Sequence, residues 1–181
     1  MDVWTALHDG DHRLARQVAT RRPRGARRLA PVVREAAEHT RLWWAAAAVL
    51  ASAGGWRGRR AAVAGVLAMA AAETVSNALV KPLCPRGRPS GEWVPAEEAR
   101  ERPDSSSFPS GHTAAAVAFT GAVTAVWPWA GAVCAAPAAL VAWERVHSGA
   151  HYPSDVAAGA AIGAGAAVLV HRAPRIARGL L

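Results

Sequence analysis

Three short stretches of the sequence hold basic residues and histidines at spacings that suit the chemistry of a tetrahedral oxyanion such as phosphate. They are KPLCPRGRP (81–89), PSGH (109–112) and RVHSGAHYPSD (145–155). Arginine offers such an anion a fork of two donors, and lysine offers a point charge. Two histidines in cationic surroundings can act as nucleophile and general acid. The three stretches therefore predict a single site for an oxyanion.

The anion-binding groups of this site can be named from residue type and position. Lys81 is the only lysine of the chain, and it stands at the end of an apolar segment. Arg88 follows seven residues later, and Arg145 ends another apolar segment. Ser110 and Gly111 precede a third apolar run, where the exposed N–H groups and dipole of a helix N-terminus favour phosphate.

The reacting groups are two histidines and a carboxylate. His112 opens an apolar run, and His151 and Asp155 precede the last one. A carboxylate near a histidine fixes the tautomer of the ring and stabilises the imidazolium form. His112, His151 and Asp155 are therefore the candidate catalytic residues.

Apolar segments predict the helices that position these groups. They cover 42–56, 61–80, 113–143 and 156–170, and Trp127-Pro128-Trp129 divides the third into two helices. In an antiparallel bundle, alternate helix ends meet on one side. We therefore expect the candidate residues of all three stretches at the same end of the bundle.

The composition favours a membrane protein. Of all residues 52% are hydrophobic, and several of the eight tryptophans stand at segment edges, as is common at membrane–water interfaces. The run 113–143 shows no polar stripe, which indicates burial in lipid. A soluble alanine-rich bundle is the alternative, because several uncharged cores are only about 15 residues long and a spanning helix needs about 20. The predicted fold is an all-α polytopic membrane bundle of about five transmembrane helices.

Residues 1–41 form a separate arm. They hold nine arginines, and Val3, Leu7, Leu14 and Val18 recur at helical intervals. This pattern predicts one or two amphipathic helices, broken around residues 22–25, that lie on a membrane surface or pack on their own domain. Residues 42–172 are expected to form the catalytic domain and 173–181 a basic tail.

Other partners are not expected. The net charge of +8 would suit nucleic acid, but no recognition helix or basic–aromatic pattern goes with it. Cys84 and Cys134 give neither metal-ligand spacing nor a disulfide framework. We predict no nucleic acid, metal or cofactor, and the sequence gives no oligomeric state.

The three stretches resemble, in order and internal spacing, the signature blocks of the type 2 phosphatidic acid phosphatase (PAP2) superfamily. The resemblance implies five phosphate-binding residues, which are Lys81, Arg88, Ser110, Gly111 and Arg145. It implies that His151 attacks phosphorus to form a phosphohistidine, that Asp155 holds His151, and that His112 protonates the leaving group. No metal is implied. The family usually has serine where this chain has Glu144, and a carboxylate there weakens anion binding unless it points away or pairs with Arg145.

The implied activity is that of an integral-membrane lipid phosphate phosphatase. Its substrate could be a polyprenyl phosphate or diphosphate, a polyprenyl-phosphoribose 5-phosphate, phosphatidic acid or phosphatidylglycerophosphate. The alternatives are a non-catalytic binder of lipid phosphates and a vanadate-dependent haloperoxidase-like enzyme. With five spans, twelve basic residues other than Lys81, Arg88 and Arg145 lie on the side of the site and six on the other, which places the site in the cytoplasm.

Several polar residues lie outside the three stretches or have no role in them. Glu73, Asn77 and Lys81 share one helical face, where Glu73 is either structural or functional. His147 is interpreted as a bystander. Solvent exposure is expected for His8, His12, His39, His171 and the acidic residues Glu97, Glu98 and Glu101.

Overall fold

The computed structural model describes residues 3–100, 102 and 104–179, and the regular structure in these ranges is helical, without strands. This confirms the predicted all-α class. The α-helices are α1 (Val3–Thr20), α2 (Arg24–Ala37), α3 (Arg41–Ala53), α4 (Gly55–Glu73), α5 (Lys81–Leu83), α6 (Ala96–Arg100), α7 (Gly111–Val126), α8 (Pro128–His147) and α9 (Pro153–Gly179). Two 3₁₀ turns (Glu38–Thr40 and Gly91–Trp93) and one π-helical segment (Thr74–Val80) complete them.

The predicted apolar segments correspond to helices whose bounds follow local chemistry, except that α3 ends at Ala53 and Trp56, the end of the first segment, lies in α4. Pro128 stands at the first position of α8, where its missing N–H costs nothing, and Trp127 separates α7 from α8. The second segment is longer than expected. A wider π turn over Thr74–Val80 joins α4 to α5, so that one continuous helix runs from Gly55 to Leu83.

Two helices of the described residues are long and apolar enough to cross a membrane, namely Gly55–Leu83 and Pro153–Ala173. Only 28% of each apolar stretch is buried inside the bundle, whereas the core helix of a soluble protein would be mostly buried. Large apolar side chains such as Val63, Leu67 and Leu169 point outward instead. α7 is equally apolar but shorter.

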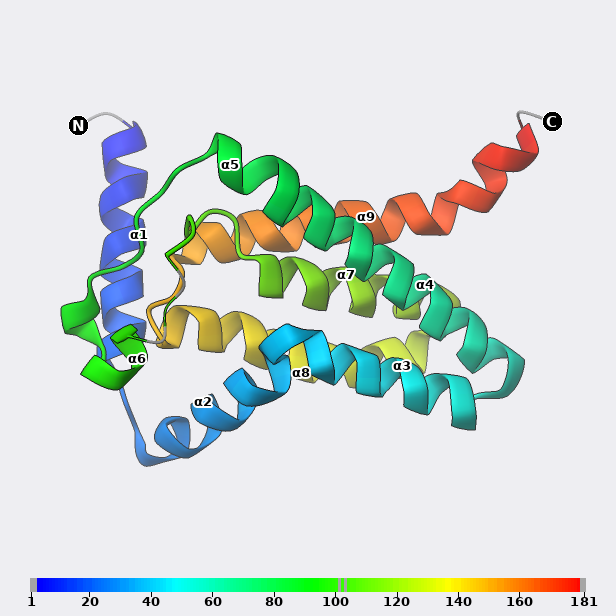
Figure 1. Ribbon diagram of the computed structural model, residues 1–181, viewed down its shortest axis with the longest axis horizontal. Helices are drawn as coiled ribbons and strands as arrows, with labels where there is room; N and C mark the ends of the chain where they lie inside the picture. The colour runs from blue at the N-terminus through cyan, green and yellow to red at the C-terminus, as the bar shows by residue number, and fades with distance from the viewer. Residues whose placement is uncertain (1–2, 101, 103, 180–181) are drawn as a thin grey trace.

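The bundle is arranged around α7, which packs against α4, α8 and α9 (Figure 1). The long helices run side by side along the molecule, whereas α1 stands across one end (Figure 1). The core is built mainly of alanines, with Phe119 of α7 packed on Trp43 of α3 at a ring distance of 5.3 Å. Small core side chains let the helix backbones approach closely.

One close approach between helices joins α7 to α9. A Cβ atom on Gly163 would lie 2.5 Å from the carbonyl oxygen of Ala114, and one on Gly159 would collide with the carbonyl oxygen of Ser110. The spacing of four residues puts both glycines on one face of α9. This contact sets the start of α7, which carries His112, against the start of α9, which carries Asp155.

The arm folds into α1 and α2, separated by residues 21–23. α1 packs against α8 and α9, and α2 packs against α8 and α3. The buried face of α2 consists of Ala26, Ala30, Val33 and Ala37. α2 thus uses this face for contact with its own bundle, whereas Leu14 of the predicted stripe on α1 is exposed and the side chains of Val3 and Leu7 lie outside the described residues.

Gly163→Ala should destabilise the protein by about 1–3 kcal/mol, because the added methyl group overpacks the contact with α7. Gly165→Ala is the matched control, since a Cβ atom there meets nothing within 4 Å. Both changes gain the same helix propensity, so their difference reports the clash. Thermal unfolding in detergent measures it, and equal melting temperatures would contradict the close packing.

Candidate active site

The structure brings the eight predicted site residues to one end of the bundle. Lys81 lies where the long α4–α5 helix ends, and Arg88 lies in the following loop. Ser110, Gly111 and His112 form the start of α7, Arg145 lies in the last turn of α8, and His151 and Asp155 flank the start of α9. Lys81, Arg88, Arg145 and His151 are all close enough to His112 to act on it electrostatically.

His151 is positioned by a backbone carbonyl. Its ring is buried, and Nδ1 lies 2.6 Å from the carbonyl oxygen of Ser107. A carbonyl only accepts hydrogen bonds, so Nδ1 carries the proton and Nε2 keeps its lone pair. Burial lowers the pKa of His151; Asp155 opposes this shift, and the positive charges of Arg88 and Arg145 add to it. The ring is therefore held in its neutral form with a lone pair on Nε2, as a nucleophile would require.

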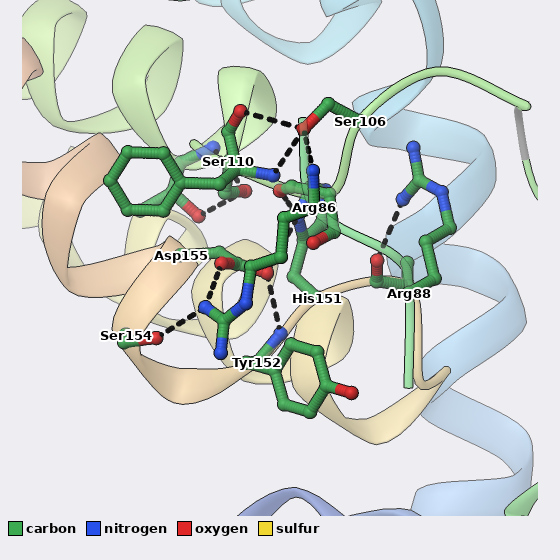
Figure 2. Close-up of polar contacts among 12 residues, drawn as sticks. Arg86, Arg88, Ser106, Ser110, His151, Tyr152, Ser154 and Asp155 are labelled. Atoms are coloured by element: carbon green, nitrogen blue, oxygen red, sulfur yellow. Dashed lines mark hydrogen bonds and ion pairs between the residues drawn. The ribbon is translucent and has the colours of Figure 1, made fainter. Parts of the chain in front are cut away.

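Asp155 lies beside His151 but is not its nearest acceptor. Its Oδ2 is 3.7 Å from Nδ1 of His151 and accepts the N–H of Tyr152 at 2.8 Å. Its Oδ1 accepts a hydrogen bond from Nη1 of Arg86 at 2.5 Å. Figure 2 shows the Arg86 guanidinium between Asp155 and Ser154. Asp155 therefore shares the positioning of His151 with the Ser107 carbonyl, which makes the shorter contact.

Arg88 and Lys81 line a cavity of about 460 Å³ together with loop residues that include Asp104 and Ser106. Arg88 is fixed there by backbone carbonyls, since Nη1 donates to Ala150 at 2.6 Å and Nη2 to Ser105 at 3.1 Å. Burial lowers the pKa of Arg88, and the charges of Arg102 and Arg145 contribute. The crowding of cations creates a strong positive potential in this cavity.

The start of α7 is capped by Ser110. Its hydroxyl accepts the N–H of Thr113 at 3.4 Å and lies 2.9 Å from Oγ1 of Thr113. Its own N–H donates to the carbonyl of Asp155 at 3.0 Å. Both polar groups of Ser110 thus have partners within the protein, and a phosphate would have to share them. Gly111 faces Asn77, whose Oδ1 lies 2.8 Å from where a Cβ atom would stand.

A second cavity, of about 270 Å³, adjoins the first through Lys81. Gly111 and His112 line it together with Glu73 and Asn77. The predicted common face of Glu73, Asn77 and Lys81 is therefore found in the structure. The 3₁₀ turn Glu38–Thr40 between α2 and α3 closes the other wall.

Glu144, the departure from the family pattern, is paired and fully buried. Its Oε2 accepts a hydrogen bond from Nε of Arg145 at 2.5 Å, and Nη2 of Arg145 forms an ion pair with the same oxygen. Its Oε1 accepts from Nε of Arg34 at 3.2 Å. Glu144 is expected to weaken anion binding unless it points away or pairs with Arg145. In the structure it pairs with Arg145.

Two residues that contact this site were missed in the sequence analysis and are not among the eight predicted site residues. Arg86 lies between two expected binders, and its guanidinium stacks over Tyr152 at 4.1 Å. Asp11 lies in the arm, where no motif indicated a role. Charge is the only feature of these two residues that the sequence offers. Their role becomes visible only from contacts between residues far apart in the chain.

Three further expectations can be compared with the structure. The prediction of a solvated Glu98 is wrong, because Arg22 holds it at 2.6 Å and Arg34 at 3.4 Å. His12 is not fully solvated either, since its ring packs on Tyr152 at 4.6 Å. His147 is buried, its Nδ1 lies 3.1 Å from the carbonyl of Val18, and it stacks on Trp143.

Comparison with known proteins agrees with the geometry. The sequence model of the PAP2 superfamily matches residues 61–178, and the chain belongs to this superfamily. Family membership supports a phosphoric ester hydrolase. No curated protein sequence matches the chain at a significant level.

Two solved structures share the fold. The first transmembrane PAP2-type phosphatidylglycerolphosphate phosphatase from Bacillus subtilis is 20% identical, with a TM-score of 0.69 over 91% of this chain and 84% of that one. Aquifex aeolicus LpxE is also 20% identical, with a TM-score of 0.66 over 87% of this chain and 92% of that one. At this identity the likeness establishes the fold alone.

Histidine NMR with ¹⁵N-labelled protein should show His151 as the neutral tautomer with the proton on Nδ1. Its titration midpoint should lie below the ordinary value of about 6.5, because burial disfavours the charged ring. His151→Gln identifies the signal by its loss. A ring protonated on Nε2 at neutral pH, or a midpoint above the ordinary value, would contradict this assignment.

Proposed function

We propose that the protein is an integral-membrane phosphatase that removes a phosphate group from a lipid phosphate through a phosphohistidine, without a metal ion. The observation that carries this proposal is the buried His151, whose Nδ1 is held by the Ser107 carbonyl beside the cationic cavity of Lys81 and Arg88. Among the described residues, no cluster of three or more histidine, cysteine or carboxylate side chains could hold a metal.

The reaction uses each group in turn. Nε2 of His151 attacks phosphorus while the phosphate oxygens bind Lys81, Arg88 and Arg145. The P–O bond to the lipid breaks, and His112 gives its proton to the leaving oxygen. Water then attacks the phosphohistidine, His112 takes a proton from that water, and the P–N bond breaks to release inorganic phosphate. Ser107 and Asp155 stabilise the positive ring of the intermediate.

The substrate is a phosphomonoester or pyrophosphate of a lipid. Polyprenyl phosphates or diphosphates, polyprenyl-phosphoribose 5-phosphate, phosphatidic acid and phosphatidylglycerophosphate all present the required group. A non-catalytic binder remains the alternative function. The ion pairs of Glu144 with Arg34 and Arg145 weaken it, because this departure from the family pattern is then balanced within the protein.

The five apolar helices α3, α4, α7, α8 and α9 are proposed to cross the membrane. The exposed apolar side chains of the bundle and the two long helices support membrane association. Charge counting favours the cytoplasm for the end that carries the site. The C-terminal end of α9 would then lie outside.

Purified wild-type protein in mild detergent should release phosphate from at least one of these lipid phosphates in the presence of EDTA. His151→Ala should lose the activity by about 10³-fold or more, because the nucleophile is gone. Its binding of orthovanadate should stay measurable, because the cationic groups remain.

The matched control is His171→Ala, which removes an exposed histidine near the far end of α9 and should leave turnover unchanged. Equal turnover in His151→Ala would exclude the phosphohistidine mechanism. Loss of all activity on addition of EDTA would exclude its metal independence. Vanadate binding without phosphate release from any lipid would favour the binding role.

A reporter fused to the C-terminus measures orientation in cells. Alkaline phosphatase should be active there and a fluorescent protein dark, because five crossings place this end opposite a cytoplasmic site. A bright fluorescent fusion with inactive alkaline phosphatase would reverse the proposed orientation or change the number of crossings.

A further inference from the structure

Two helices of the N-terminal arm send charged side chains to residues of the candidate active site. From α1, Asp11 reaches Arg86 and the start of α9. From α2, Arg34 reaches Glu144. The arm lies outside residues 61–178, which match the family model, so the matched family sequence does not include these contacts.

The contacts that start from α1, called the α1 branch below, lead from Asp11 through Arg86 to Asp155. Asp11 is buried, and its Oδ2 accepts a hydrogen bond from Nη2 of Arg86 at 2.6 Å. Nη1 of the same guanidinium donates to Asp155 at 2.5 Å, so Arg86 bridges the two carboxylates. Burial opposes ionisation of Asp11, but bonds from Ser154 and Arg86 outweigh it and lower its pKa. Asp11 therefore contributes an ionised carboxylate to the bridge.

Asp11 also caps α9. Its Oδ1 accepts the backbone N–H of Ser154 at 2.9 Å, and its Oδ2 accepts the Ser154 hydroxyl at 2.5 Å. A carboxylate is favoured at this position because the N-terminus of a helix carries partial positive charge. The next residue is Asp155, so the cap fixes the backbone that carries the carboxylate beside His151.

The contacts that start from α2, called the α2 branch below, lead from Arg34 through Glu144 to Arg145. Glu144 is fully buried and contacts Arg145 through one oxygen and Arg34 through the other. Without Arg34, the whole charge of Glu144 would fall on Arg145, and a phosphate would compete with it for that guanidinium. With Arg34 in place, a second cation shares the carboxylate. Arg34 is itself held by Glu98 of α6 at 3.4 Å.

We infer that the arm completes the active site through two positioning residues, Asp11 and Arg34, which affect different steps of the reaction. Asp11 positions the Arg86–Asp155 pair beside the nucleophile and acts on the chemical step. Arg34 keeps Glu144 from competing with phosphate at Arg145 and acts on anion affinity. The roles of Asp155 and Arg145 in this inference rest on the proposed function.

Measurements of kcat and KM for single variants distinguish the α1 branch from the α2 branch. Asp11→Asn should lower kcat about tenfold with little change in KM, since a lost bond to a charged group is worth at least that much. Arg34→Gln should leave kcat nearly unchanged and raise both KM and the inhibition constant of orthovanadate about tenfold. The matched controls are Asp9→Asn on α1 and Arg28→Gln on α2, both exposed. A purely structural arm would lower stability and active fraction without this split.

A rescue experiment tests the α2 branch more sharply. In the double variant Arg34→Gln/Glu144→Ser no carboxylate competes at Arg145, so vanadate affinity should return to within about threefold of wild type, as coupled sites do. Arg34→Lys should restore part of the affinity by keeping the charge. The double variant removes one cation and one carboxylate together and keeps the net charge of the cluster, so it should fold even where Arg34→Gln alone does not.

The outcomes are distinguishable from failure of the proposed function. If wild-type protein hydrolyses lipid phosphates but Asp11→Asn and Arg34→Gln behave like their controls, the inference is wrong and the function stands. If wild-type protein hydrolyses none, calorimetric titration with orthovanadate still tests the α2 branch. No difference in vanadate affinity between Arg34→Gln and the double variant would overturn that branch.

Discussion

The mutual repulsion of buried and half-buried cations is the constraint on which this site depends. Arg86, Arg88 and Arg145 converge on one end of a largely apolar bundle, and Arg102 adds its charge to that of Arg88. Without a bound anion, such a cluster must be balanced from within the protein, because an uncompensated buried charge is very costly. The protein balances it in two ways. Carboxylates pair with Arg86 and Arg145, and backbone carbonyls hold Arg88.

The helices supply the precision that such a balance requires. Glycine and alanine at the α7–α9 contact let two backbones touch, and the hydrogen bond from Ser110 to the Asp155 carbonyl fixes their starts against each other. Alanine side chains have no rotamers to lose, so this packing costs little side-chain entropy. The alanine-rich composition therefore supports the close packing that positions the site.

The sequence predicts much of this architecture because the relevant signals are local. Apolar runs and Pro128 define the helices, and the motif residues stand at helix ends that an antiparallel order brings together. The rest depends on contacts between distant residues. Asp11 and Arg86 are 75 positions apart, and Arg34 and Glu144 are 110 apart. Nothing in periodicity or spacing distinguishes Asp11 from its exposed neighbour Asp9. The sequence is equally compatible with a Glu144 that weakens anion binding and one that is paired, because its partner Arg34 lies far away in the chain.

The contact between His151 and the Ser107 carbonyl has a consequence for genetics. Every amino acid carries a main-chain oxygen, so no side-chain replacement at position 107 deletes this acceptor. Scanning mutagenesis would record the position only through the Ser107 hydroxyl, which bonds to Gly87. The atom that sets the proton on the nucleophile would leave no mark in such a map. Insertions or deletions in the loop before α7 would expose it, because they move the backbone itself.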